Sequence, residues 1–217
     1  MILFIKINEN FQPGFESLHV FILMIFFVWL ILLIYSLKIY KLKKTIRYFV
    51  PIFITGIIGE LCAQANGSYL YPGYFLYFSA LGGSIPVIIG LGWSVNLFLF
   101  LHIGKDVVTK IFKKENFKQL FIISIVSGIF AMCLDFLEDP LAHHNSWWVW
   151  NETIQRPTLF EIPISNYIGW FLIVGGMTLL TLLIDRSRYS ENRKLLLNLT
   201  IPFIIFIILG PYFWFIV

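Results

Sequence analysis

Residues 118–150 read KQLFIISIVSGIFAMCLDFLEDPLAHHNSWWVW, and this stretch joins an apolar run to a dense polar cluster. The run up to Leu137 has about 20 residues, the length of α-helix that crosses the hydrocarbon core of a bilayer. The cluster from Asp135 to Trp150 holds three carboxylates, two adjacent histidines and three tryptophans. The stretch therefore predicts a membrane helix that ends in a concentration of polar chemistry.

Apolar runs of this kind recur along all 217 residues. The chain is 59% hydrophobic and 13% charged, with a mean hydropathy of +0.82, whereas soluble domains carry about 25% charged residues. This composition predicts an all-α fold, a polytopic integral membrane helical bundle that forms a single transmembrane domain over residues 1–217. We expect about six spans, at roughly 17–38, 47–66, 84–104, 118–137, 162–184 and 195–216.

The basic residues are distributed unevenly between these spans. Five of the 16 lie from Lys38 to Arg47, five from Lys105 to Lys118, and four from Arg186 to Lys194. These three connections alternate with the others, so they fall on one side of the membrane, and the positive-inside rule places that side in the cytoplasm. We therefore expect a multi-pass protein of the cell membrane with both termini and the loops 67–83 and 138–161 outside. Because the basic excess is a topology signal, we do not expect nucleic acid as a partner.

Polar side chains inside the predicted spans are costly to bury, and each is a functional hypothesis. Four spans carry such residues toward their outer half or near mid-membrane, and spacings of three or four place members of a group on one helix face. The groups are Glu60 with Gln64, Trp93 with Asn96, Asp135 with Glu138 and Asp139, and Asn166 with Trp170.

These residue types together suit acid–base chemistry in an apolar site. Desolvation and a neighbouring carboxylate both disfavour the anion of a buried carboxyl group, so such a group can stay protonated and act as a general acid. A second carboxylate or a histidine can act as the base, and aromatic rings can stabilise a developing cation through their faces. Simpler roles remain open: Glu138 as a solvated helix end, and the tryptophans as an interfacial aromatic belt.

Two further functions remain open from the residues alone. His143 and His144, together with Asp139, could bind zinc or iron in a metal-dependent integral-membrane hydrolase. Alternatively, the protein is a small transporter or assembly factor whose buried carboxylates relay protons or bind a cation. Lipid-facing and partner-facing apolar surfaces look alike in a sequence, so the oligomeric state is not predicted.

Several motifs resemble those of a known family. The distal ones are Asp135-x-x-x-Asp139-Pro140, the Trp-x-Trp at Trp148 and Trp150, and IPISNYIGW at 162–170. Upstream of them stand Gly59-Glu60, YPGYFLY at 71–77, and Ile85-Pro86 followed by Trp93. Over roughly residues 55–175 the chain resembles the membrane carotenoid hydratases, which include the bisanhydrobacterioruberin hydratases of archaea and the γ-carotene hydratases of bacteria. One departure is Glu161, where a glycine is expected before the Ile-Pro.

The resemblance implies an enzyme that adds water across the terminal isopropylidene double bond of an acyclic carotenoid, giving a tertiary alcohol. The expected partners are this lipophilic isoprenoid substrate and the lipid bilayer, and no cofactor is expected. We assign protonation of the alkene to Asp135 or Asp139, and the partner or water-orienting base to Glu60, with Asn166 positioning the carboxyl group or the water. The expected substrate-binding residues are Tyr74, Trp93, Asn96, Trp148, Trp150 and Trp170.

Overall fold

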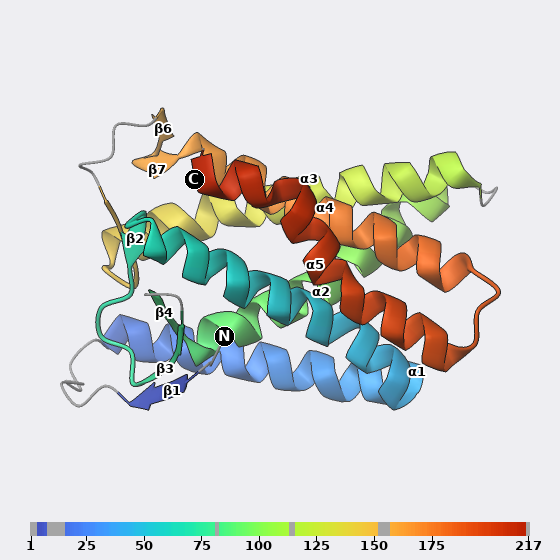
Figure 1. Ribbon diagram of the computed structural model, residues 1–217, viewed down its shortest axis with the longest axis horizontal. Helices are drawn as coiled ribbons and strands as arrows, with labels where there is room; N and C mark the ends of the chain where they lie inside the picture. The colour runs from blue at the N-terminus through green and yellow to red at the C-terminus, as the bar shows by residue number, and fades with distance from the viewer. Residues whose placement is uncertain (1–3, 8–15, 81–82, 113–115, 152–156, 216–217) are drawn as a thin grey trace.

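The computed structural model describes residues 4–7, 16–80, 83–112, 116–151 and 157–215. Five helices within these ranges are long and apolar enough to cross a membrane. The prediction of an all-α polytopic membrane bundle is thus confirmed (Figure 1). The helices are α1 (Glu16–Ala65), α2 (Val87–Ile111), α3 (Phe117–His144), α4 (Ile164–Arg186) and α5 (Glu191–Phe215).

Helix α1 consists of two helices joined at Lys41. That residue has φ 62° and ψ 174°, which is not helical backbone, and the chain reverses its direction there (Figure 1). A straight helix of 50 residues would be about 75 Å long, more than twice the thickness of a bilayer core. The two predicted spans 17–38 and 47–66 therefore both lie on α1, one on each side of Lys41.

Short strands gather at one end of the bundle, here called the strand end (Figure 1). A three-stranded antiparallel sheet has the order β1-β3-β4, and two two-stranded pairs join β2 to β5 and β6 to β7. The strands are β1 (Phe4–Ile7), β2 (Tyr69–Leu70), β3 (Leu76–Ala80), β4 (Gly83–Pro86), β5 (Val149–Trp150), β6 (Thr158–Leu159) and β7 (Ile162–Pro163).

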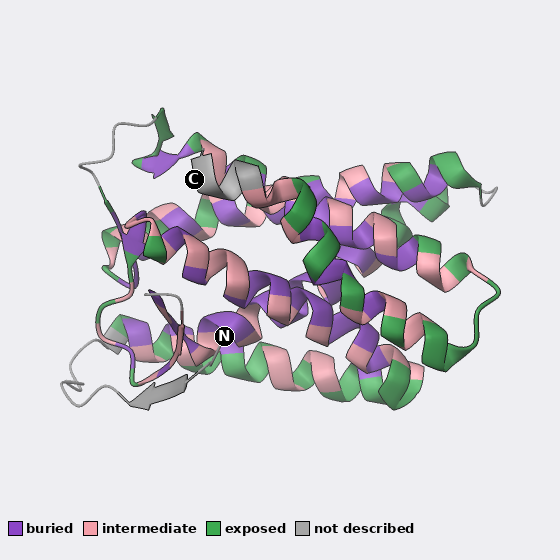
Figure 2. Cartoon of the chain, in the orientation of Figure 1, coloured by how far each residue is buried: buried purple, intermediate pink, exposed green. Residues whose placement is uncertain are grey.

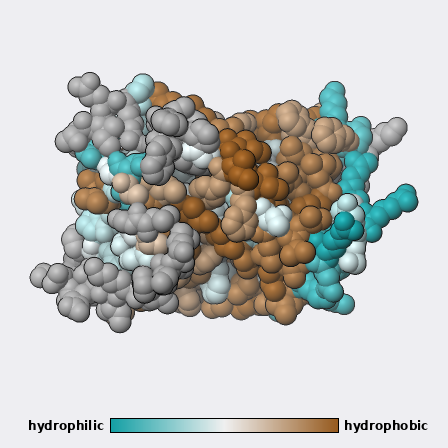
Figure 3. All heavy atoms as spheres, viewed as in Figure 1, coloured by the Kyte–Doolittle hydropathy of each residue, from teal (hydrophilic) through white to brown (hydrophobic). Residues whose placement is uncertain are grey.

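The opposite end, here called the basic end, carries the three basic connections. Figure 3 shows its hydrophilic residues beyond a broad band of hydrophobic ones. Buried Arg47 on α1 lies 3.0 Å from Asp185 on α4, and the Tyr48 hydroxyl donates a hydrogen bond of 2.9 Å to the same carboxylate. These contacts tie α1 to α4. The location of the basic end in the cytoplasm stays a prediction.

Helix α3 is longer than predicted, because it continues past Leu137 through Pro140 to His144. Proline removes one helical hydrogen bond, a loss that membrane helices tolerate. The helix ends at His144, and just beyond it Ser146 has a φ of 56°, which lets the Trp147 N–H donate to the Ala142 carbonyl at 2.8 Å. The expectation of a loop beginning at residue 138 was therefore wrong.

The hairpin between β6 and β7 explains the departure at residue 161. Its two connecting residues, Phe160 and Glu161, have φ values of 54° and 67°. Two consecutive positive φ values define the hairpin turn in which glycine is favoured at the second position. Glu161 adopts the conformation in which the sequence pattern led us to expect a glycine.

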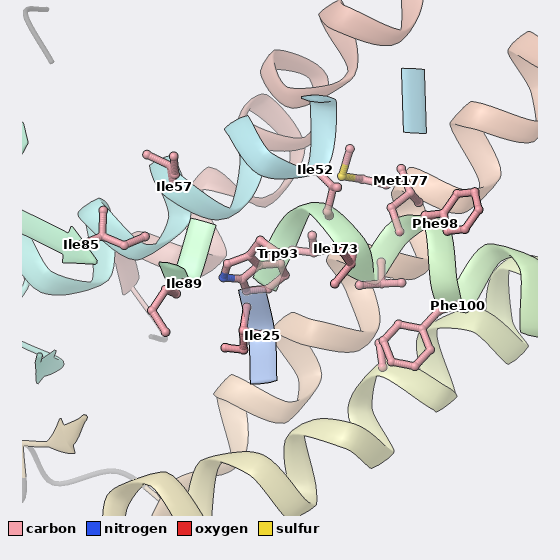
Figure 4. Close-up of a cluster of buried hydrophobic side chains, with 14 of the residues drawn as sticks. Ile25, Ile52, Ile57, Ile85, Ile89, Trp93, Phe98, Phe100, Ile173 and Met177 are labelled. Carbon is pink, nitrogen blue, oxygen red and sulfur yellow. The ribbon is translucent and has the colours of Figure 1, made fainter. Parts of the chain in front are cut away.

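The core lies in the middle of the bundle, where all five helices contribute buried hydrophobic residues (Figure 2). Trp93 of α2 lies among Ile25, Ile89 and Ile173 (Figure 4). Gly56 on α1 makes room for it, because a Cβ at this position would overlap the Trp93 indole. This packing fixes Trp93 at the base of the candidate site.

Candidate active site

A cavity of about 390 Å³ lies near the strand end, between both halves of α1 and helices α2, α3 and α4. Its walls are mainly aromatic and aliphatic, and its polar groups are few. The lining polar side chains are Glu60, Tyr69, Tyr71, Asn96, Glu138, Asp139 and Asn166. An apolar pocket with a few converging polar groups is the usual form of a small-molecule site.

Two carboxyl groups on α3 share one amide. Asp135 and Asp139 are four residues apart on one face of the helix, and both are buried. The Asn166 side-chain nitrogen on α4 donates to Asp135 Oδ2 at 2.8 Å and to Asp139 Oδ2 at 2.7 Å. Asp139 lines the cavity, whereas Asp135, one turn away on α3, does not.

Glu60 has a different set of partners, all of them donors. The Tyr69 and Tyr71 hydroxyls donate hydrogen bonds to Oε2, that of Tyr71 at 2.7 Å. The Trp93 indole N–H donates a hydrogen bond to Oε1 at 2.8 Å. Burial, and next the Glu60 charge, raise the pKa of both tyrosine hydroxyls well above their usual range. The hydroxyls therefore stay protonated, and their hydrogen bonds favour a charged Glu60 against the desolvation that disfavours it.

Aromatic rings form most of the remaining wall. Trp93 stacks on Trp170 with ring centroids 4.2 Å apart and an angle of 21° between planes. Closer to the strand end, Tyr69 meets Trp150 edge-on at 4.7 Å, and Tyr71 meets Trp148 edge-on at 6.0 Å. The faces of such rings attract cations.

The β2–β5 pair covers the cavity at the strand end. In its register Tyr69 faces Trp150, and beside it the Asn151 N–H donates to the Ser68 carbonyl at 2.8 Å. The Trp147 indole, stacked on Phe21, donates to Ser17 at the start of α1. Two loops distant in sequence are thereby fastened to each other and to α1 over the site.

The cavity brings together eight of the ten residues that the sequence predicted for the site. The exceptions are Asp135, which lies one turn from Asp139 on α3, and Tyr74, which packs edge-on against Tyr71 with centroids 5.8 Å apart. The roles assigned to all ten remain predictions. Sequence reasoning missed Tyr69 and Tyr71, although their alternation in SYLYPGY places them on one side of an extended segment.

The histidines do not join this group. His143 accepts a hydrogen bond on Nδ1 from the Trp150 N–H at 3.2 Å, and its Nε2 lies 4.0 Å from Glu161. His144 is exposed on another side of the helix. Among the described residues, no cluster of three histidine, cysteine or acidic side chains could hold a metal ion. The structure thus does not bring His143, His144 and Asp139 together as ligands.

The fold and the cavity define an integral membrane protein with carboxyl groups buried beside an apolar cavity. Residues 20–216 match the family described as "Carotenoid biosynthesis protein", so the chain belongs to that family. The protein therefore has a role in carotenoid biosynthesis. No curated protein and no solved structure matches the chain.

Proposed function

We propose that the protein is a carotenoid hydratase, which adds water to a terminal isopropylidene double bond of an acyclic carotenoid and forms a tertiary alcohol. The observation that carries this proposal is the presence of two distinct carboxyl sites on one apolar cavity. One is the aspartate pair that shares Asn166, and the other is Glu60, surrounded by donors. Alkene hydration needs both an acid and a base.

The aspartate pair is suited to be the acid. Two neighbouring carboxyl groups away from water are best accommodated when the pair holds one proton, because two adjacent anions repel each other. Asp139 transfers this proton to the less substituted alkene carbon, and the positive charge develops on the tertiary carbon. The Trp93, Trp148 and Trp170 rings line the space where this cation forms.

Glu60 is suited to be the base. Its three hydrogen bonds all come from donors, so the carboxylate can accept the proton that a water molecule releases on attacking the cation. The new bond joins the water oxygen to the tertiary carbon. The proton on Glu60 then returns to the aspartate pair through water, which completes the cycle without a redox change.

A lipid-soluble substrate can reach this cavity from the side. Four apolar lining residues are also exposed on the outside of the bundle: Met24 and Val28 on α1, and Leu137 and Leu141 on α3. The cavity therefore opens between these helices toward the hydrocarbon. One end of a long polyene could enter there while the rest of the molecule stays in the bilayer.

The test is expression in a bacterial strain that accumulates lycopene or a longer acyclic carotenoid, followed by chromatography and mass spectrometry of the pigments. We expect products heavier by one or two waters, and a loss of roughly 100-fold or more in Asp139→Asn and Asp135→Asn. Asp106→Asn, the same change on an exposed residue of α2, is the control. Well-folded wild-type protein that leaves every carotenoid unchanged would refute the proposal.

A further inference from the structure

A second, smaller cavity of about 40 Å³ adjoins the first. It lies between the second half of α1 and α4, and it is bounded on one side by Trp93 and Tyr69. Small residues create it, because glycines and an alanine face each other where larger side chains would fill the space. These are Gly56, Gly59 and Ala63 on α1 and Gly169 on α4.

The two cavities share a wall. The residues that line both are Glu60, Tyr69, Trp93, Asn166 and Trp170. The shared wall thus contains the candidate base, the amide that holds the aspartate pair, and the stacked indoles beside the candidate cation site. A molecule in the small cavity would reach the reacting carbon past Glu60.

The size and lining of the small cavity fit water. A cavity needs roughly 10–15 Å³ of free volume to hold one water molecule, which must also have two or more polar partners. The lining includes acceptor oxygens on Thr55, Glu60 and Asn166. The Thr55 hydroxyl donates to the Pro51 carbonyl at 2.9 Å, so its oxygen lone pairs remain available to accept.

We propose that the small cavity is the water chamber of the site, and that it supplies the nucleophile from the side of Glu60. This inference rests on the proposed hydratase function. As the water oxygen bonds to the tertiary carbon, one of its protons passes to the Glu60 carboxylate, and the hydroxyl group remains on the product. The large apolar cavity holds the alkene, and the chamber keeps water apart from it until the cation forms.

Gly59 offers a way to fill the chamber selectively. It lines the small cavity and not the large one, and a Cβ at this position would meet no heavy atom within 4 Å. Gly59→Ala and Gly59→Val therefore add one and three carbons at the wall of this cavity without a predicted clash at Cβ. Gly210 on α5 also has open space around a Cβ and lies in neither cavity, so Gly210→Val is the matched control.

The experiment measures the two products that the carbocation can give in membranes suspended in deuterium oxide. Capture by water gives the alcohol, whereas loss of a proton returns an alkene that carries deuterium at the protonated carbon, or an isomer with a shifted double bond. We expect Gly59→Val to lower alcohol formation by roughly 100-fold and to keep deuterium incorporation. Gly59→Ala should give an intermediate loss, and Gly210→Val should match the wild type.

Each other outcome overturns a defined part of the proposal. If Gly59→Val forms alcohol at the wild-type rate, the chamber does not deliver water, although the hydratase function stands. If alcohol formation and deuterium incorporation fall together in folded Gly59→Val, Gly59 supports the site structurally and the chamber proposal fails. If the wild type neither forms alcohol nor incorporates deuterium, the hydratase function fails and the chamber proposal with it.

Discussion

At the level of residues, the two carboxyl sites differ in the chemistry of their neighbours. The Glu60 carboxylate accepts hydrogen bonds from two phenol hydroxyls and an indole N–H. The aspartates share a single amide nitrogen, and Asp135 Oδ1 has no hydrogen-bond partner among the described residues. Glu60 is thus surrounded by groups that stabilise a carboxylate, whereas the aspartate pair has an oxygen on which a proton can reside.

The difference predicts separate effects of changes around Glu60. Glu60→Gln keeps the size of the side chain but removes its capacity to take a proton, so hydration should fall by roughly 100-fold. Tyr71→Phe removes one of three donors and leaves Tyr69 and Trp93 in place, so its loss should be clearly smaller. Rates measured in membranes with a supplied acyclic carotenoid would check this order. Undiminished hydration by Glu60→Gln would remove Glu60 from the mechanism.

Helical spacing accounts for the part of the site that sequence could predict. Asp135 with Asp139, and Asn166 with Trp170, follow from steps of four on helices. The two tyrosine donors to Glu60 lie on β2 and directly after it, in a segment too short for alternation alone to indicate a strand, so their place in the site depends on the tertiary pairing of β2 with β5. For the same reason the sequence could not tell that Tyr71 and not Tyr74 lines the cavity.

At the level of elements, the extra length of α3 shapes the site. The turns beyond Leu137 carry Glu138, Asp139 and Leu141, all of which line the cavity. The prediction ended this span at residue 137 because the apolar run stops there, before Glu138 and Asp139. The helix nevertheless continues through Pro140, since the surrounding helices can support the interrupted turn.

The side opening between α1 and α3 can be tested by narrowing it. Leu137 lines the cavity and is 74% exposed, so Leu137→Trp should obstruct entry and slow turnover of a long carotenoid several-fold. Ile207 on α5 is 79% exposed and lines neither cavity, which makes Ile207→Trp a control of equal bulk. Conversion rates at matched protein levels are the measurement. Equal rates in the two variants would argue against entry at this side.

At the level of the whole molecule, the two ends have separate tasks. The candidate chemistry lies at the strand end, and the ion pairs that join α1, α4 and α5 lie at the basic end. The composition and the alternation of basic connections predicted the bundle and its two unlike ends. The strands were not predicted, because they are short and because two of the pairings, β1 with β3 and β2 with β5, join segments that are remote in sequence.

Because the two ends are separate, a substitution at the basic end should lower the stability of the protein without changing its products. Arg47 is 2% exposed and pairs with Asp185, so Arg47→Met would leave a partly buried carboxylate without its main partner. The free energy of unfolding should fall by up to about 3 kcal/mol, and the protein that remains folded should form the same products. Thermal unfolding in detergent would be compared with Lys43→Met, which changes an exposed lysine. Identical midpoints would contradict the assigned role of Arg47.

The side opening at the strand end also has a consequence for the product. A polyene long enough to reach across the hydrocarbon core of about 30 Å presents only one of its two ends to the cavity at a time. The new hydroxyl group would be released close to the headgroups, where it can be hydrated and can anchor the product. Hydration of the second end would then require the whole carotenoid to reverse its orientation across the bilayer. Singly hydrated carotenoid should therefore build up before the doubly hydrated form, with its alcohol facing one leaflet.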